Sequence, residues 1–320
     1  MSKKPLILVT NDDGITAPGL RKLIEIMNEI GDVVVVAPNT PQSAKGHAIT
    51  INSTLHCNKI RSSSGPQTEY SCSGTPADCV KLGVNELLEK KPDLCVSGIN
   101  HGSNSSINVI YSGTMSAAIE AGIEGIPSIG FSLLDYRWNA NFEHTKKYIR
   151  KITINVLEND MPKNIVLNVN IPRFNKKGIK GIKICRQANA HWIEEFDKRI
   201  NPMGQKYYWL TGRFVNEDKG KDTDEWALEK GYISIVPIQF DLTAHHYIKN
   251  LNSWSFEIKK YYKWFYFWFA CKCYRNDNNF CNFFSSHIAG EFNSTVPSRK
   301  TGKPHKYGSS YKFAHFLYSY

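Results

Sequence analysis

The chain has 320 residues, of which 41% are hydrophobic and 22% are charged. This length suits one large α/β domain or two smaller ones, and the composition is that of an ordinary globular protein. No apolar run approaches the roughly 20 residues that a membrane span needs, and the first residues do not form a signal peptide. We therefore expect a cytoplasmic protein without a membrane partner.

The net charge of +11 raises the question of a nucleic-acid partner. From Ser255 onward the chain carries ten Lys or Arg residues against three Asp or Glu, a net +7, so the preceding body is only about +4. A basic end is a weak electrostatic attraction rather than a specific site. We expect no specific nucleic-acid partner, and nucleic-acid binding through this basic end stays an alternative.

Apolar runs alternate with helix signals through the first half of the chain. The expected strands are Leu6–Thr10, Val33–Val36, Leu94–Ser97 and Ile126–Leu133. Helices are expected to start near Pro18 and at Thr75, where Thr followed by Pro is typical of a helix N-terminus, and a third covers Gly113–Ala121. The β-α-β-α order and the continuous β-branched runs predict a doubly wound α/β domain with a mostly parallel sheet.

The second half has a looser pattern. Ile165–Ile171 and Gly231–Pro237 are expected to be strands, and Asp224–Lys230 is expected to be a short helix. Lys180–Ile184 and Tyr207–Val215 are interpreted as hairpin strands that project from the core.

The end of the chain differs from the body. More than half of the chain's aromatic residues lie in its last 70 residues, without a clean period of 2 or 3.6. We interpret this stretch as an aberrant extension, with a partner-binding or membrane-surface patch as the alternative. Its residues Cys271, Cys273, Cys281 and His287 fit no common zinc spacing. The cysteines of the body are expected to be buried free thiols: Cys57, Cys72, Cys79, Cys95 and Cys185.

Two adjacent carboxylates, Asp12 and Asp13, follow the first strand in the sequence Asn11-Asp12-Asp13-Gly14. In open α/β sheets ligands bind outside the carboxyl ends of the strands, and neighbouring acids there repel one another unless a cation lies between them. Oxygen ligands suit magnesium or manganese. The alternative is a helix cap or an Asx turn at Asp13.

Further loops reach the same edge of the predicted sheet. Ser43 follows the second strand and Asn100 the third, and both offer neutral oxygen ligands. The backbone N–H groups at the helix start near Gly113 predict a phosphate cradle. Each of these residues alone is more typical of a turn or of packing, and their convergence on one edge is what favours a site.

The segment Leu8-Val9-Thr10-Asn11-Asp12-Asp13-Gly14 closely resembles the N-terminal signature of the SurE family of nucleotidases. The resemblance covers residues 5 to about 250 and continues in consistent order through Val36-Ala37-Pro38, Ser43, Gly74-Thr75-Pro76-Ala77-Asp78-Cys79-Val80, Ser97-Gly98-Ile99-Asn100-His101-Gly102-Ser103-Asn104, Tyr111-Ser112-Gly113-Thr114, Gly125-Ile126-Pro127-Ser128-Ile129 and Pro237-Ile238-Gln239-Phe240-Asp241-Leu242-Thr243. Several motifs in one order make the resemblance specific. Asn39 departs from it, because the family often has an acid there.

This resemblance implies a Rossmann-like domain with a C-terminal β-hairpin extension that builds a homodimer or homotetramer. It implies hydrolysis of nucleoside 5′- and 3′-monophosphates with one divalent cation per subunit, Mg²⁺ or Mn²⁺. The metal ligands that it implies are Asp12, Asp13, Ser43 and Asn100. The phosphate-pocket positions that it implies are Asn11, Asn104, Ser112, Gly113 and Thr114.

The expected mechanism is attack on phosphorus by a metal-activated water, with Asp12 and Asp13 as catalytic residues. Direct attack by one of these carboxylates and a proton donor role for His101 stay open. The expected domains are a phosphatase domain at 1–252, with a core at about 1–172 and a hairpin region at about 173–252, and the extension at 253–320. A catalytically impaired member of the family is the alternative to an active enzyme. A receiver-type signalling module is disfavoured, because the strand Leu94–Ser97 does not end in an Asp.

Overall fold

The computed structural model describes residues 4–61 and 65–256. Its internal contacts divide the chain into two compact units, residues 1–243 and residues 244–320. Of the second unit, the described part contains the short helix α7 (His245–Leu251). Most of the aromatic extension, including its cysteines, lies outside the described residues, so the domain boundary at residue 252 stays a prediction.

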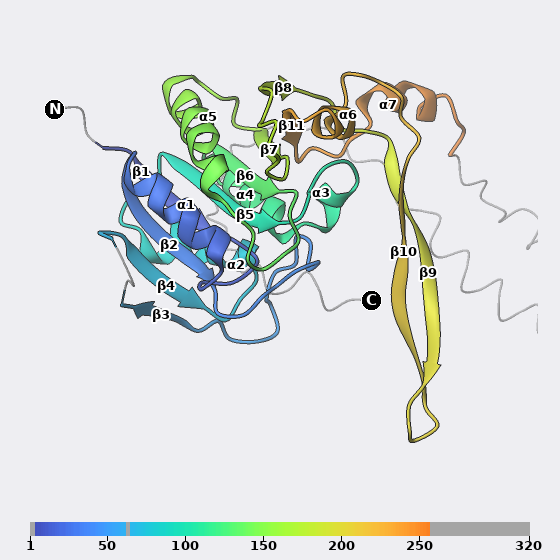
Figure 1. Cartoon of the computed structure of the whole chain (residues 1–320), viewed down its shortest axis with the longest axis horizontal. Coiled ribbons are helices and arrows are strands. Elements are labelled where there is room, and N and C mark those ends of the chain that lie inside the picture. The colour runs from blue at the N-terminus through green and yellow to red at the C-terminus, as the bar shows by residue number, and fades with distance from the viewer. Residues whose placement is uncertain (1–3, 62–64, 257–320) are drawn as a thin grey trace, which may run out of the picture. The chain divides into compact units, whose positions relative to one another are not determined.

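A nine-stranded sheet forms the centre of the first unit (Figure 1). Its strands, in chain order, are β1 (Leu6–Thr10), β2 (Asp32–Pro38), β3 (Cys57–Ile60), β4 (Thr68–Cys72), β5 (Leu94–His101), β6 (Ser128–Leu133), β7 (Ile165–Ile171), β8 (Ile182–Ile184) and β11 (Ile233–Gln239). The spatial order is β3-β4-β2-β1-β5-β6-β7-β11-β8. Strands β4, β2, β1, β5, β6 and β7 run parallel, whereas β3 and β11 pair antiparallel with β4 and β7. The predicted α/β class with a mostly parallel sheet is confirmed.

Helices cover both faces of this sheet (Figure 1). The α-helices of the first unit are α1 (Pro18–Asn28), α2 (Pro76–Leu82), α3 (Asn108–Tyr111), α4 (Gly113–Ile123), α5 (Lys146–Glu158) and α6 (Asp224–Glu229), of which α3 has no buried residue. The apolar sides of α1 and α5 share one hydrophobic cluster with the sheet, and those of α2 and α4 share another. Each central strand is therefore buried on both faces, as its continuous apolar sequence requires. Among the described residues no helix has the length and apolar character to cross a bilayer.

The helix starts follow from local sequence. Pro18 occupies the first turn of α1. At α2, the Thr75 hydroxyl accepts the Asp78 N–H (3.2 Å), and the Asp78 carboxylate accepts the Thr75 N–H (2.9 Å), which completes a capping box. The Ser112 hydroxyl caps α4 by accepting the Met115 N–H (3.0 Å). Because α4 begins at the carboxyl edge of the sheet, its first turn lies beside Asp12.

Strand β5 is longer than predicted. The sequence predicts a loop from Gly98, but β5 continues to His101, with a register irregularity between Ser97 and Asn100. Gly98 has a φ of +126°, and a Cβ there would lie 2.3 Å from the Phe131 carbonyl oxygen. Only glycine allows this approach, after which Asn100 pairs with Ser132 on β6. The irregularity places Asn100 and His101 at the end of the strand rather than in a free loop.

One of the two predicted hairpin strands is wrong. The hairpin pairs β10 (Lys206–Asn216) with β9 (Ala190–Ile200), so the prediction for Tyr207–Val215 is confirmed. Residues Ile182–Ile184 instead form β8, which pairs parallel with β11 in the main sheet, because Ile182 packs on the central hydrophobic cluster. The hairpin extends from the body of the first unit (Figure 1).

Replacing Phe131 with Ala tests the assignment of the core. Phe131 lies on β6, is fully buried and belongs to the central cluster. We expect F131A to lower the free energy of unfolding by about 3–5 kcal/mol, since it leaves a cavity. The control is I184A at the edge strand β8, where Ile184 is 71% exposed and the loss should stay within about 0.5 kcal/mol. Guanidinium unfolding measures both, and equal losses would contradict the assignment.

Candidate active site

The acidic pair follows a buried strand. All five residues of β1 are buried, and so are Asn11 and Asp12 beyond it. The chain then turns at Gly14, whose φ is +101°, and the Asn11 amide nitrogen donates to the Gly14 carbonyl oxygen (3.0 Å). This turn holds Asp12 inside the protein while Asp13 stays partly exposed. The pair therefore lies at the carboxyl edge of the sheet, where the topology of parallel α/β sheets places ligands.

The start of α4 lies directly against Asp12. The Thr114 hydroxyl donates to one Asp12 carboxylate oxygen. At Gly113, a Cβ would lie 2.7 Å from the Asp12 Cβ and 2.9 Å from its Oδ2. Any side chain at position 113 would therefore displace the carboxylate. This close approach requires a glycine at position 113. The first turn of α4 and the Asp12 carboxylate are therefore in direct contact.

Burial makes the charge on Asp12 costly. Burial, followed by repulsion from the neighbouring Asp13, raises the pKa of Asp12 to about 6, while hydrogen bonds from Thr114 oppose the shift. Within the described part of the chain, neither carboxylate forms an ion pair with a Lys or Arg. A cation bound at this place would offset the repulsion between the two acids.

Asp13 is oriented by His101 at the end of β5. Its Oδ2 lies 3.0 Å from the His101 Nδ1 and accepts the His101 backbone N–H at 3.3 Å. The imidazole stacks on Trp138 with the ring centroids 5.5 Å apart and meets Phe142 edge-on at 5.1 Å. The opposite nitrogen, Nε2, is buried without a hydrogen-bond partner. This packing fixes the ring, so His101 positions Asp13.

Ser43 belongs to an exposed loop that is tied to the same site through its backbone. The N–H of the preceding residue, Gln42, donates to the Asp12 carbonyl oxygen (2.7 Å). Further along, the Gly46 N–H donates to the Tyr111 carbonyl oxygen just before α4 (3.3 Å). The loop therefore joins β1 to the segment before α4, with Ser43 between the two attachment points.

Asn100 and Asn104 have different environments. The Asn100 amide nitrogen donates to the Gly102 carbonyl oxygen (2.9 Å), so the amide oxygen is left to act as a ligand. Asn104 is buried, and its amide nitrogen donates to the Ser132 hydroxyl (2.8 Å). Its backbone N–H donates to the Asn170 Oδ1 on β7 (2.8 Å). These bonds hold the Asn104 loop against β6 and β7.

The predicted ligand positions fit a hard divalent cation. Two carboxylates, an amide oxygen and a hydroxyl on adjoining segments form an all-oxygen set, and the buried Asn11 Oδ1 beside them has no hydrogen-bond partner. No group of three or more His, Cys, Asp or Glu side chains arranged as metal ligands occurs in residues 4–61 and 65–256. The expected set contains only two acids, so it belongs to the kind of site in which neutral oxygens complete the shell.

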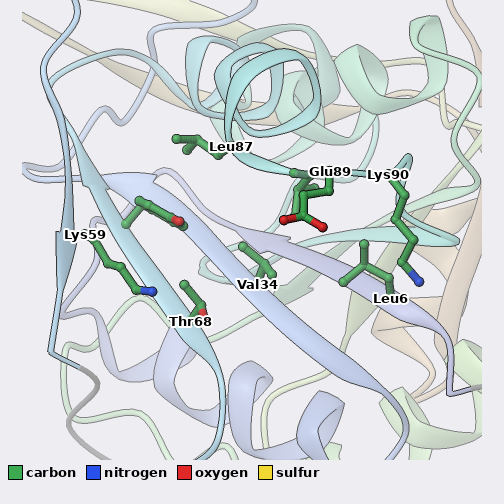
Figure 2. A pocket seen from close by; sticks show the side chains of 9 residues that line it. Leu6, Val34, Lys59, Thr68, Leu87, Glu89 and Lys90 are labelled. Carbon is green, nitrogen blue, oxygen red and sulfur yellow. The ribbon is translucent and has the colours of Figure 1, made fainter.

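A separate hollow lies on the sheet away from these residues (Figure 2). It has a volume of about 430 Å³, and Figure 2 shows Leu6, Val34 and Thr68 on strands beneath it, with Glu89 and Lys90 along its side. Leu6 begins β1, whereas the acidic pair follows the end of that strand. The hollow is therefore not part of the acidic site.

Several residues around the site were not identified from the sequence. Trp138 and Phe142, which hold His101, lie in a segment without a motif. Asn168 and Asn170 hold the Asn104 loop, and they are polar residues at alternate positions of an otherwise apolar strand. That pattern was a usable signal, because polar residues in a buried strand need hydrogen-bond partners.

The fold and the site define a class: an α/β protein with an acidic, oxygen-rich site where parallel strands meet the start of a helix. Residues 7–194 match the family model of the survival protein SurE. The 5′-nucleotidase SurE of Christiangramia forsetii is 72% identical over 254 residues, which cover 79% of this chain and 98% of the relative. The corresponding protein of Bacteroides fragilis is 46% identical and is covered over 99% of its length.

The crystal structure of the SurE protein from Aquifex aeolicus matches with a TM-score of 0.68 and 41% identity, covering 78% of this chain and 98% of that one. The chain belongs to the SurE family. This membership excludes the receiver-module alternative. About a fifth of the chain lies outside the alignments.

Replacing Thr114 tests the support of Asp12. T114V removes the hydroxyl and keeps the shape, so an ionised Asp12 loses a hydrogen bond, and we expect a loss of about 1.5–3 kcal/mol of unfolding free energy. T114S keeps the hydroxyl and removes only a methyl group, which should cost about 1 kcal/mol. Urea unfolding at pH 7.5 with EDTA compares the two variants. If T114S is as unstable as T114V, the hydroxyl does not support Asp12.

Proposed function

We propose that this SurE-family protein is a metal-dependent 5′-nucleotidase that hydrolyses nucleoside 5′-monophosphates, and also 3′-monophosphates, to a nucleoside and phosphate. The observation that supports the chemistry is the buried carboxylate of Asp12, which lies against the N-terminus of α4 beside a second carboxylate. The relatives named 5′-nucleotidase SurE are aligned over nearly their whole length, and their name supports the substrate class.

In this proposal Asp12, Asp13, Ser43 and Asn100 hold one Mg²⁺ or Mn²⁺ ion per subunit. A divalent cation at this place screens the phosphate charge and lowers the pKa of a water molecule. Thr114 orients the Asp12 carboxylate, and His101 orients that of Asp13. The four ligands come from three separate segments, so the fold, rather than any one loop, fixes their spacing.

The phosphate group is proposed to bind beside the first turn of α4. Backbone N–H groups at a helix N-terminus point outward, and the helix dipole favours an anion there. Gly113 brings this turn to Asp12, and the Ser112 hydroxyl caps it. Asn11 and Asn104 complete the proposed pocket, with Asn104 held in place by Ser132 and Asn170.

We propose a water molecule as the nucleophile. One oxygen of Asp12 already accepts the Thr114 hydroxyl, and the nearby Asp13 increases the electrostatic cost of its charge. Such a carboxylate is suited to holding a cation and to accepting a proton from water. The rival route, direct attack by an Asp, forms an aspartyl phosphate, and isolation of such a phosphoprotein during turnover would establish that rival.

Phosphate release from a panel of nucleoside 5′- and 3′-monophosphates, with p-nitrophenyl phosphate as comparison, tests the proposal. We expect release that stops with EDTA and returns with Mn²⁺ or Mg²⁺. D12N should lower release more than about 100-fold, since loss of a ligand should exceed the 10–100-fold effect of losing a supporting partner. It should also lose the heat of Mn²⁺ binding in calorimetry.

The matched control is D32N, because Asp32 is an exposed acid at the start of β2, at the opposite edge of the sheet. It should keep activity and Mn²⁺ binding. Metal-independent release, or release by D12N at the level of D32N, would contradict the proposal. A wild-type protein that binds Mn²⁺ but releases no phosphate would be the catalytically impaired member of the family.

We further propose that the β9–β10 hairpin joins subunits into a homodimer or homotetramer. Phe196 pairs directly with Leu210, and strand alternation puts Trp192, Tyr208 and Phe214 on the same face. Phe196 and Leu210 are both 66% exposed. An isolated two-stranded hairpin is marginally stable, and an exposed apolar face of this kind marks an interaction site. The other face also carries Trp209, but a larger share of its residues is charged, namely Glu195, Asp197, Arg199 and Arg213.

Charged substitutions on the apolar face test this assembly. We expect F196E/L210E to lower the oligomeric mass in light scattering, because burying two carboxylates without partners is costly. T211E places one carboxylate on the more charged face and should keep the mass of the wild type. If both variants keep the wild-type mass, or if the wild type is already monomeric, the hairpin is not the assembly interface.

The remaining proposals concern organisation and location. We propose a catalytic domain at residues 1–252, an extension at 253–320 that does not contribute to the site, and a cytoplasmic location. The alignments with the relatives, which cover 79% of the chain, support this division. Nucleic-acid binding through the extension is the second candidate activity, supported by its net charge of +7.

A further inference from the structure

Three thiols meet where β3, β4 and α2 pack together. Cys72 on β4 and Cys79 on α2 are fully buried in the same hydrophobic cluster, and Cys57 on β3 packs against that cluster and is half-buried. All three are free cysteines. They lie away from the acidic site, whose proposed ligands are all oxygens.

Cys57 and Cys72 are direct partners across two antiparallel strands. The neighbouring backbone bond runs from the Ser73 N–H to the His56 carbonyl oxygen (2.8 Å), so the cysteine pair occupies a non-hydrogen-bonded position of the ladder. Side chains at such positions share a face, and their Cα atoms are about 4.5 Å apart. This separation lies within the range of about 4.4–6.8 Å that a disulfide allows.

The environments of the two sulfurs differ. The Cys72 sulfur accepts the Gly74 N–H (3.4 Å), and a hydrogen bond from the Cys79 thiol lowers the pKa of Cys72 to about 7. Burial raises the pKa of Cys57 to about 11. The thiolate of the pair therefore forms on Cys72, and the thiolate is the reactive form of cysteine.

Access to Cys72 depends on β3. This strand has four residues, forms one edge of the sheet, and pairs only with β4 among the described strands. Short edge elements with exposed backbone bonds open at low free-energy cost, and opening here would expose Cys72 beside the partly exposed Cys57.

We propose that Cys57 and Cys72 are a peroxide-sensitive thiol pair that closes to a cross-strand disulfide. The Cys72 thiolate attacks one oxygen of hydrogen peroxide, the O–O bond breaks, and the released hydroxide takes up a proton, leaving a sulfenic acid on Cys72. The Cys57 sulfur then loses its proton and attacks the Cys72 sulfur. The S–S bond forms, the S–O bond breaks, and a second water leaves, so two thiols and one peroxide give one disulfide and two waters.

The pair is attached to the loop that carries Ser43. The Cys72 carbonyl oxygen accepts the N–H of Asn39 (2.7 Å), which is the first residue after β2. Three residues later the Gln42 N–H donates to the Asp12 carbonyl oxygen (2.7 Å). Oxidation of the pair would therefore act on the backbone segment at which the Ser43 loop begins, whichever substrate the acidic site takes.

The test is peptide mapping of the native full-length protein after treatment with hydrogen peroxide at pH 7.5. We expect loss of two thiols per chain from this region, a linked Cys57–Cys72 peptide, and full recovery with dithiothreitol. C57S should stop at the first step and give a dimedone adduct on Cys72. The control C95S alters a buried cysteine outside the pair and should behave like the wild type.

Three outcomes would overturn the proposal. They are a linked Cys72–Cys79 peptide in place of Cys57–Cys72, no dimedone adduct on Cys72 in folded C57S, and a linked peptide that appears only after urea unfolding. Circular dichroism of C57S establishes that it is folded, and its half-buried position favours tolerance of serine. Thiol mapping needs no turnover, so its failure is distinct from failure of the nucleotidase proposal.

Discussion

The burial of one carboxylate constrains the rest of this structure. Asp12 lies inside the protein beside a second acid, where ionisation is unfavourable without compensation. The hydroxyl of Thr114 supplies part of that compensation, and the close approach of α4 at Gly113 supplies a helix N-terminus. Both depend on the order of the strands, because β1 and β5 must be adjacent for α4 to start beside β1. The strand order thus places a hydroxyl group and a helix N-terminus against a buried carboxylate.

The second acid, Asp13, is held in place by segments other than those that hold Asp12. Asp13 is held by His101, which is itself fixed between two aromatic rings. That arrangement uses the end of β5, where the register irregularity after Gly98 redirects the chain. A general acid must reach the leaving group, whereas the buried and unpartnered Nε2 lies within packed aromatic surface. The geometry therefore favours a positioning role for His101 over the proton donor considered from sequence.

The sequence predicted those features that depend on local chemistry. Apolar runs identified β1, β2 and β7, and Thr75 followed by Pro76 identified the start of α2. Prediction from the sequence failed for those elements whose structure depends on tertiary contacts. Strand β9 has five charged residues among eleven and no strict alternation of apolar residues, and it is stabilised by pairing with β10 along its whole length. Helix α5 went unassigned, although its buried side packs on the central cluster.

The same distinction applies to the site. Asp12, Asp13 and Asn100 could be placed at one edge of the sheet from sequence, because parallel strands deliver their carboxyl ends together. The hydrogen bond from Thr114 to Asp12 could not be predicted from the sequence. It joins residues 102 positions apart and depends on how closely α4 approaches β1. The Thr114 hydroxyl donates to the carboxylate, so in the proposed site only the helix backbone and Ser112 of this turn would be left to bind phosphate. In the proposed site, phosphate would therefore be bound chiefly by the backbone of a helix terminus, and the surrounding segments would provide specificity for the nucleoside.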